Sequence, residues 1–254
     1  MLTDTELERY SRQILLPELD LKGQELLRAA HVLVVGVGGL GSPVAIYLAA
    51  AGVGELTLMD PDRVDLSNLQ RQPIHSTATV GQLKVLSAKE HLQQLNPLVR
   101  VNGIAESFAS EAGAAKLGSF SLIVDCTDNF AVRFALNRFS QQLSVPLVSG
   151  AAIRFDGQVS VYDPRIATSP CYRCWHDEQG PEDHSCVNNG VLAPLVGLVG
   201  SVQASEAIKV ITGVGESLVG RLLLIDALSM NFRTLQLHKD LNCSVCGKAE
   251  HPAG

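Results

Sequence analysis

The chain has 254 residues, of which 46% are hydrophobic and 18% are charged, and its formal net charge at pH 7 is −6. A chain of this length can bury a full core, and the acidic balance argues against a general nucleic-acid-binding protein, which needs a basic face. The first ten residues are too polar for a signal peptide, and the most apolar stretch, Val191–Val202, is too short to cross a bilayer. We therefore expect a cytoplasmic protein that binds neither membranes nor nucleic acid.

The chain begins with a predicted helical arm over residues 1–30. A Thr-x-x-Glu capping box opens a helix predicted over Thr3–Gln13, and a second short helix is predicted over Gln24–Ala30. Arg12 lies on this arm. By itself, its position indicates only an exposed helical face.

The next stretch has the pattern of a nucleotide-binding βαβ unit. Val32–Val35 predicts a buried strand, Leu40–Ala51 a helix and Leu56–Met59 a second strand. Asp60 follows about 20 residues after the glycines of a G-x-G-x-x-G motif, the separation typical of an acid that binds ribose hydroxyls. Such glycines let phosphate approach the backbone, and the helix start offers N–H groups to it. The glycine loop contains Gly36, Gly38, Gly39 and Gly41.

Strands and helices then alternate up to residue 150. The predicted strands are Val99–Ile104, Leu122–Val124 and Pro146–Ser149, and the predicted helices are Val80–Leu95, Ser110–Leu117 and Asn129–Gln142. This alternation predicts an α/β fold with a doubly wound, Rossmann-like and mostly parallel sheet, whose residues 31–150 form the nucleotide-binding part.

The pattern changes after Gly150. Gly157–Tyr162 predicts an antiparallel strand, and a long polar segment over Arg165–Gly190 predicts a functional loop. A helix over Ala193–Ile211 follows, and then a strand pair over Leu222–Ile225 and Phe232–Leu237. We expect one domain over residues 1–254, with a C-terminal antiparallel extension of its sheet.

Polar side chains follow the strands at the sheet edge where α/β proteins bind ligands. Arginine and lysine neutralise phosphates and a carboxylate holds Mg²⁺, whereas a nicotinamide enzyme has little use for them. The pattern therefore favours a nucleoside triphosphate, although the P-loop signature is absent. A dinucleotide-dependent oxidoreductase and a non-catalytic, nucleotide-binding zinc scaffold remain alternatives. The residues concerned are Asp60, Asp62, Asn68, Arg71, Gln72, Lys84, Asp128 and Asn129.

Two Cys-x-x-Cys motifs predict a structural zinc site. Four thiolates complete a tetrahedral shell and leave no open position for chemistry. A redox role for one motif is the rival interpretation. The four ligands are Cys171, Cys174, Cys243 and Cys246. Of the two other cysteines, Cys126 ends a buried strand, and Cys186 lies in the polar loop, where it is either inert or a nucleophile or sulfur acceptor.

Several strings resemble the MoeB/ThiF family of adenylating enzymes, the prokaryotic relatives of ubiquitin-activating enzymes. They are RYSRQILL, VGVGGLG, DLSNLQRQ, DCTDN, SGAAIRFDGQ, CYRC and CSVCG. The resemblance extends from Tyr10 to Gly247.

The resemblance implies roles for individual residues. Gly39 would lie against ATP and Asp60 would bind the ribose. Phosphate contacts would come from Asn68, Arg71 and Lys84. Asp128 would coordinate Mg²⁺ beside Asn129, Arg12 would reach the partner's phosphates across a homodimer interface, and Cys171, Cys174, Cys243 and Cys246 would bind zinc. Cys186 resembles a cysteine that handles sulfur in the thiamine branch of the family.

The resemblance also implies an activity. ATP would adenylate the C-terminal glycine carboxylate of a small ubiquitin-fold sulfur carrier ending in Gly-Gly, and a separate sulfur donor would then form the thiocarboxylate. We expect the carrier of molybdenum cofactor synthesis, with the thiamine-pathway carrier as the alternative, to dock on residues 151–254.

Overall fold

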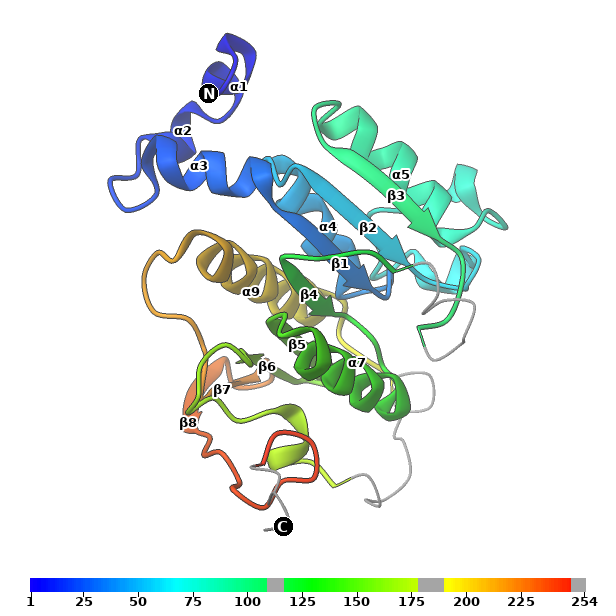
Figure 1. Ribbon diagram of the computed structural model, residues 1–254. Coiled ribbons are helices and arrows are strands. Elements are labelled where there is room, and N and C mark those ends of the chain that lie inside the picture. Colours follow the sequence, from blue (N-terminus) through cyan, green and yellow to red (C-terminus); the bar gives the residue numbers. More distant parts are fainter. Residues whose placement is uncertain (109–116, 178–189, 248–254) are drawn as a thin grey trace.

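The computed structural model describes residues 1–108, 117–177 and 190–247. Its strands form an eight-stranded sheet in the order β3-β2-β1-β4-β5-β6-β7-β8 (Figure 1). The first five strands in this order run parallel and the last three antiparallel. The expected α/β fold, with a parallel part and an antiparallel extension, is confirmed. The strands are β1 (His31–Val35), β2 (Glu55–Met59), β3 (Arg100–Ile104), β4 (Leu122–Asp125), β5 (Leu147–Ile153), β6 (Asp156–Tyr162), β7 (Arg221–Asp226) and β8 (Asn231–Gln236).

Helices cover both faces of the sheet. Strand β1 shows why, because all but its first residue are buried and successive side chains point to opposite faces. Val32 and Val34 join the larger core, while Leu33 and Val35 join the smaller one. The larger core is built with α3 (Asp20–Ala29), α4 (Gly41–Ala50), α5 (Lys84–Leu95) and α9 (Ala193–Thr212), and the smaller one with α7 (Phe130–Leu143).

Helix α9 confirms the helix predicted over Ala193–Ile211 to within one residue, and it is longer than the apolar stretch Val191–Val202. It has 20 residues and is, among the described residues, the helix that meets the length and composition expected of a membrane span. Its buried residues, among them Leu195 and Val199, lie in the larger core, and the helix packs on α4 and the sheet. These contacts are those of the core helix of a globular fold.

The N-terminal arm differs from the single helix predicted over its first residues. The capping box forms, with the Glu6 carboxylate accepting from the Thr3 N–H at 2.7 Å. The helix then breaks at Tyr10, which leaves helical geometry and is buried, with its hydroxyl accepting from Asn96 Nδ2 at 2.9 Å. This long-range contact, which local sequence does not encode, divides the arm into α1 (Asp4–Arg9) and α2 (Ser11–Ile14).

Helix α5 begins at Lys84 rather than at Val80. Gly81 has a φ of +87°, which ends the preceding turn and excludes a continuous helix. Three short 3-10 turns complete the described elements: η1 (Leu66–Asn68), η2 (Thr77–Thr79) and η3 (Tyr172–Cys174). The helix predicted over Ser110–Leu117 lies almost wholly outside the described residues.

Candidate functional site

A cavity of about 520 Å³ opens where β1, β2 and β4 end. This volume is in the range of small-molecule sites. Because parallel strands end at one edge of the sheet, residues far apart in sequence meet here. Most of the predicted nucleotide-binding residues line the cavity: Gly36, Gly38, Gly39, Asp60, Asp62, Asn68, Arg71, Gln72, Lys84, Asp128 and Asn129.

The glycine loop needs its glycines for two different reasons. Gly36 has a φ of +89°, and a Cβ there would lie 2.7 Å from the Cys126 carbonyl. A Cβ on Gly41 would lie 1.9 Å from the Gly36 carbonyl, so Gly41 serves the close packing of the loop and does not line the cavity. Gly38 and Gly39 have more room and face the cavity.

Asp60 fixes the backbone of the glycine loop through hydrogen bonds. Its buried carboxylate accepts from the Val37 N–H at 2.7 Å and from the Asp62 N–H at 2.9 Å. Burial raises the pKa of Asp60, an effect that Lys84 and these two hydrogen bonds oppose. The carboxylate therefore fixes the backbone of the loop, and any contact with a ribose would use its remaining lone pairs.

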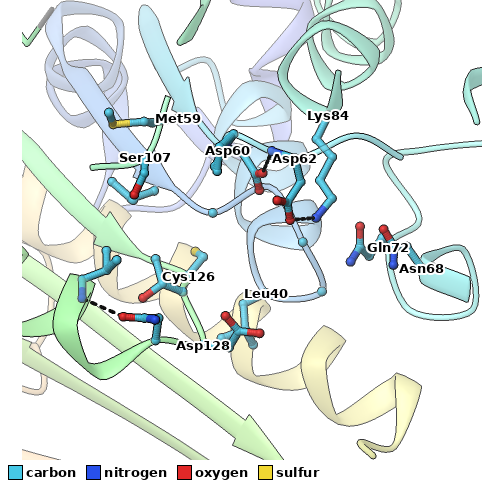
Figure 2. A pocket seen from close by; sticks show the side chains of 18 of the residues that line it. Leu40, Met59, Asp60, Asp62, Asn68, Gln72, Lys84, Ser107, Cys126 and Asp128 are labelled. Carbon is cyan, nitrogen blue, oxygen red and sulfur yellow. Dashed lines mark hydrogen bonds and ion pairs between the residues drawn. The ribbon is translucent and has the colours of Figure 1, made fainter. Parts of the chain in front are cut away.

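Lys84 is the first residue of α5, where its charge opposes the helix dipole. Its side chain is 8% exposed, and its Nζ lies 2.8 Å from Asp62 Oδ2, whose side chain is 63% exposed. Figure 2 shows this pair on one side of the glycine loop and Asp128 on another. A cation held against one exposed carboxylate can exchange that partner for an anionic ligand.

The turn around η1 brings three more polar groups to the wall. Arg71 donates to the Ser67 carbonyl at 3.2 Å, and Asn68 accepts from the Asp65 N–H at 3.3 Å. Gln72 is buried, and its Oε1 has no hydrogen-bond partner among the described residues. An unpaired buried acceptor on a cavity wall suits a ligand that brings a donor.

The loop after β4 carries Asp128, and buried groups hold that loop. The Asp125 carboxylate accepts from the Thr127 N–H at 3.0 Å, the Thr127 hydroxyl at 2.7 Å and the Ser149 hydroxyl at 2.8 Å. Gln203 Nε2 donates to the Asp125 carbonyl at 2.7 Å. Asn129 caps α7 by accepting from the Val132 N–H, so part of its side chain serves the helix.

Arg133 lines the same cavity and was missed by the sequence analysis. Its guanidinium donates to the Thr127 carbonyl at 2.6 Å, and its Nε lies 3.9 Å from Asp125 Oδ2. Burial acts to lower the pKa of Arg133, but Asp125 and Tyr172 outweigh it and raise the pKa. The signal available in the sequence was its place four residues after Asn129, which puts it on the same side of the helix as the capped loop.

Arg12 is not among the residues that line the cavity. It lies exposed on α2, in the N-terminal arm, which projects beyond the amino ends of the strands (Figure 1). The other three residues with predicted catalytic roles, Arg71, Lys84 and Asp128, are brought together.

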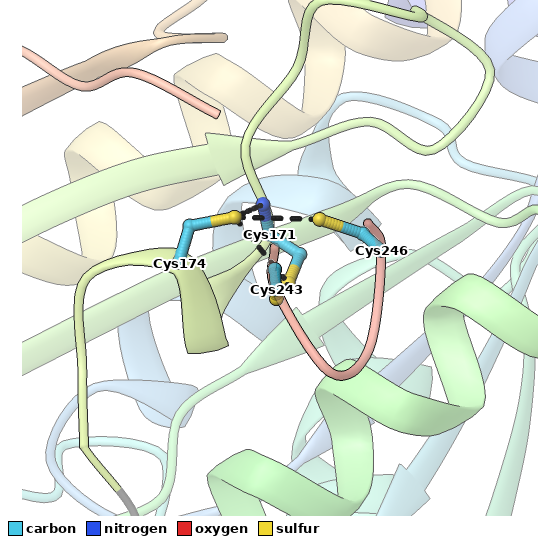
Figure 3. A group of neighbouring side chains, drawn as sticks. All are labelled: Cys171, Cys174, Cys243 and Cys246. Atoms are coloured by element: carbon cyan, nitrogen blue, oxygen red, sulfur yellow. Dashed lines mark hydrogen bonds between the residues drawn. The ribbon is translucent and has the colours of Figure 1, made fainter. Parts of the chain in front are cut away.

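The four cysteines of the two Cys-x-x-Cys motifs converge, as Figure 3 shows. Their sulfurs all lie within 4.8 Å of one another, with Cys171–Cys243 at 3.7 Å and Cys174–Cys246 at 3.3 Å. Four sulfurs bound to one zinc ion would be ~3.8 Å apart, so the set fits a tetrahedral metal. Burial raises the pKa of Cys171 to about 11, and a divalent cation would reverse that effect.

Of the remaining two cysteines, the structure describes Cys126 but not Cys186. Cys126 is a buried free thiol whose pKa is raised, chiefly by burial. Cys186, the predicted sulfur-handling residue, lies outside the described residues.

Comparison with known proteins gives a consistent set of relatives. The model of the ThiF family matches residues 10–245. The molybdopterin-synthase adenylyltransferase of Salmonella typhimurium is 47% identical over 247 residues, which cover 97% of this chain and 99% of that protein. The sulfur carrier protein adenylyltransferase of Thermus thermophilus is 46% identical over 250 residues, covering 96% and 92%.

A solved structure, that of E. coli MccB with ATP, superimposes with a TM-score of 0.84 at 25% identity, over 96% of this chain and 75% of that one. Since the family model and the two sequence relatives each span nearly the whole chain, the protein belongs to the ThiF family.

Proposed function

We propose that this protein adenylates the C-terminal glycine carboxylate of a small ubiquitin-fold sulfur carrier, using ATP. The observation that carries the proposal is the cavity, where a glycine loop, the cations Arg71 and Lys84 and the carboxylate of Asp128 meet at one sheet edge. Relatives of matching length are named as adenylyltransferases of molybdopterin synthase and of a sulfur carrier.

The reaction is a displacement at phosphorus. A carboxylate oxygen of the carrier attacks the α-phosphate, the bond from that phosphorus to the bridging oxygen breaks, and pyrophosphate leaves with the electron pair. The products are the acyl-AMP and pyrophosphate. No general base is needed, because the attacking carboxylate is ionised at neutral pH. The chain must instead stabilise the negative charge that builds up on the phosphates.

The cavity offers groups for each part of the nucleotide. Gly36, Gly38 and Gly39 let phosphates approach the loop, while Asp60 and Gln72 lie within reach of the nucleoside. Phosphate contacts come from Asn68, Arg71 and Lys84. Lys84 gives up its ion pair with Asp62 when it binds the phosphate. Asp128, beside Asn129, would hold Mg²⁺, which would supply positive charge against the phosphates.

The same proposal includes a homodimer. Arg12 does not line the cavity of its own chain, so we assign it to the cavity of a partner chain. The nucleotide-binding part is residues 31–150, and the carrier docks on residues 151–254, which zinc at the four cysteines stabilises. The carrier that we propose is the small subunit of molybdopterin synthase, the sulfur donor is a separate protein, and the reaction takes place in the cytoplasm.

Exchange of labelled pyrophosphate into ATP tests the proposal. The protein is mixed in turn with the molybdopterin-pathway carrier and the thiamine-pathway carrier, each with a matched version that lacks the terminal glycine. We expect exchange with the intact molybdopterin-pathway carrier alone. Exchange with the thiamine-pathway carrier instead would reassign the pathway and leave the chemistry standing. No exchange with either carrier, despite ATP binding, would refute the proposed function.

A further inference from the structure

One face of α7 connects the four-cysteine site to the nucleotide cavity. Arg133 and Asn137 are one helical turn apart and therefore lie on the same face. Asn137 is fully buried, and its Nδ2 donates to Cys171 Sγ at 3.5 Å while its Oδ1 accepts from the Tyr172 N–H at 2.9 Å. A side chain that hydrogen-bonds a metal-ligating sulfur orients that ligand. The start of the first Cys-x-x-Cys motif is thus held by α7.

The other end of the same face holds the Asp128 loop. The Arg133 guanidinium donates to the Thr127 carbonyl at 2.6 Å and lies against the buried carboxylate of Asp125. Its charge also acts on Asp128. Arg133 therefore sets both the backbone position and the electrostatic surroundings of the residue to which we assign Mg²⁺.

Tyr172 joins the two ends. It is the residue after Cys171, is 2% exposed, and acts on Arg133, whose pKa it helps to raise. Its ring stacks on His176 at 4.0 Å between centroids and meets Phe134 of α7 edge-on at 5.2 Å. Arg133 also lies over the ring of Phe130, 5.5 Å from the centroid. Tyr172 and Arg133 therefore each pack on an aromatic ring of α7, Phe134 and Phe130 respectively.

We propose that a metal at the four-cysteine site and a magnesium–nucleotide in the cavity bind cooperatively, with Asn137, Tyr172 and Arg133 as the positioning residues that couple them. The inference rests on the proposed function, because it takes Asp128 as the magnesium ligand. The zinc site then does more than stabilise the fold. Its occupancy holds Tyr172 and, through Arg133, the Asp128 loop in the geometry that binds the nucleotide. None of the three residues needs to touch the reacting atoms.

Reciprocity provides the test, because coupled sites must change each other's affinity by the same factor. Zinc affinity is measured by competition with a chelator, on the full chain, with and without MgATP. We expect MgATP to tighten zinc binding by about fivefold or more in the unaltered protein, the usual size of such coupling. Tyr172→Phe, which removes only the hydroxyl through which Tyr172 acts on the pKa of Arg133, should abolish this difference.

Tyr162→Phe is the matched control. Tyr162 is as deeply buried and meets the Tyr172 ring edge-on at 6.0 Å, but its hydroxyl interacts with Ser160 and Trp175. This variant makes the same chemical change in the same cluster, so we expect the coupling to persist in it. Loss of coupling in both variants would indicate general loosening of the core and would overturn the proposal.

Asn137→Asp tests the coupling by changing a residue that contacts the four-cysteine site. It also provides a test if the Tyr172→Phe variant does not fold. It keeps an oxygen for the Tyr172 N–H but replaces the donor to Cys171 by a negative charge. We expect weaker zinc binding and, through the coupling, weaker MgATP binding by calorimetry. Gln142→Ala, on an exposed position of the same helix, should change neither affinity.

The outcomes separate the two proposals. If the unaltered protein binds MgATP but its zinc affinity does not respond, the coupling is refuted and the proposed function stands. If Tyr172→Phe retains the full response, Tyr172 is not the link and the proposal fails. If the unaltered protein does not bind MgATP at all, the proposed function itself fails.

Discussion

At the scale of single residues, the charged side chains of the cavity are positioned by hydrogen bonds to the backbone and by ion pairs with one another. Lys84 shows this most clearly, because burying a lysine at the start of a helix costs stability unless an anion compensates. In the protein alone that anion is Asp62, which is largely exposed to solvent. The arrangement favours exchange of Asp62 for a phosphate at little cost.

The first prediction concerns Lys84. Lys84→Ala should lower the rate of pyrophosphate exchange by about 10²–10³-fold, because it removes charge stabilisation where the transition state is most negative. The measurement is kcat for exchange at saturating ATP. Lys89→Ala, a matched loss of a lysine on the same helix outside the cavity lining, is the control and should leave kcat unchanged. An equal loss in both variants would mean that the helix, not the site, was damaged.

The second prediction concerns His75, which joins the glycine loop to α5. Its Nε2 pairs with the Val37 carbonyl at 3.0 Å and its Nδ1 with the Ser87 hydroxyl at 2.9 Å. Burial lowers the pKa of His75, an effect opposed by the Val37 hydrogen bond and reinforced by Lys84. The unfolded chain therefore takes up a proton before the folded one does, so stability is complete above a pH of about 6.5 and falls as the pH drops below it.

Urea unfolding between pH 7 and pH 5 measures this effect. His75→Gln retains a donor for the Val37 carbonyl but does not titrate, so its free energy of unfolding should fall less steeply over this range. Parallel curves for the two proteins would show that His75 does not contribute to the acid sensitivity.

At the scale of elements, the loops that follow parallel strands are the functional parts, and each is fixed by its flanking helix. The loop after β4 illustrates this, because Asn129 ends the loop and caps α7 at the same time. The type and order of the strands and helices followed from alternation of apolar runs, since that pattern is local. Their ends did not, because Tyr10 and Gly81 break helices for reasons of packing and backbone geometry.

The third prediction concerns this cap. Asn129→Ala should destabilise the protein by about 1 kcal/mol, the usual cost of losing a side-chain N-cap. Asn129→Ser keeps a capping oxygen and should lose much less. Chemical denaturation of the three proteins measures their free energies of unfolding. An Asn129→Ala variant as stable as the unaltered protein would show that the cap does not stabilise the loop.

At the scale of the whole molecule, the cavity gathers its groups from β1, β2, β4 and the helices between them. Arg12 does not line it, and the N-terminal arm that carries Arg12 lies beyond the amino ends of the strands. The homodimer that we propose would account for this placement, because each arm would then serve the partner's cavity. In that arrangement, a site would be complete only when two chains meet.

The fourth prediction is complementation between two inactive chains. Arg12→Ala and Lys84→Ala should each lose activity alone, because each removes a cation from every site. Mixed under conditions that allow exchange of subunits, they should regain about a quarter of full activity, since half of the dimers are mixed and each of these has one intact site. Arg9→Ala is the control, because Arg9 is a neighbouring arginine on the arm that contacts the Leu95 carbonyl, and this variant should keep full activity by itself. No recovery on mixing would place Arg12 in its own chain's site or in none.

The sequence by itself determined the fold class, the glycine loop and the four cysteines, because hydrophobic periodicity and close motif spacing are local signals. It also indicated which polar residues lie at strand ends. Only the tertiary structure decided which of them meet, because proximity between β1, β2 and β4 depends on strand order. The role of Arg133 was hidden for the same reason: a buried arginine on a helix becomes meaningful only when Thr127, Asp125 and Tyr172 surround it.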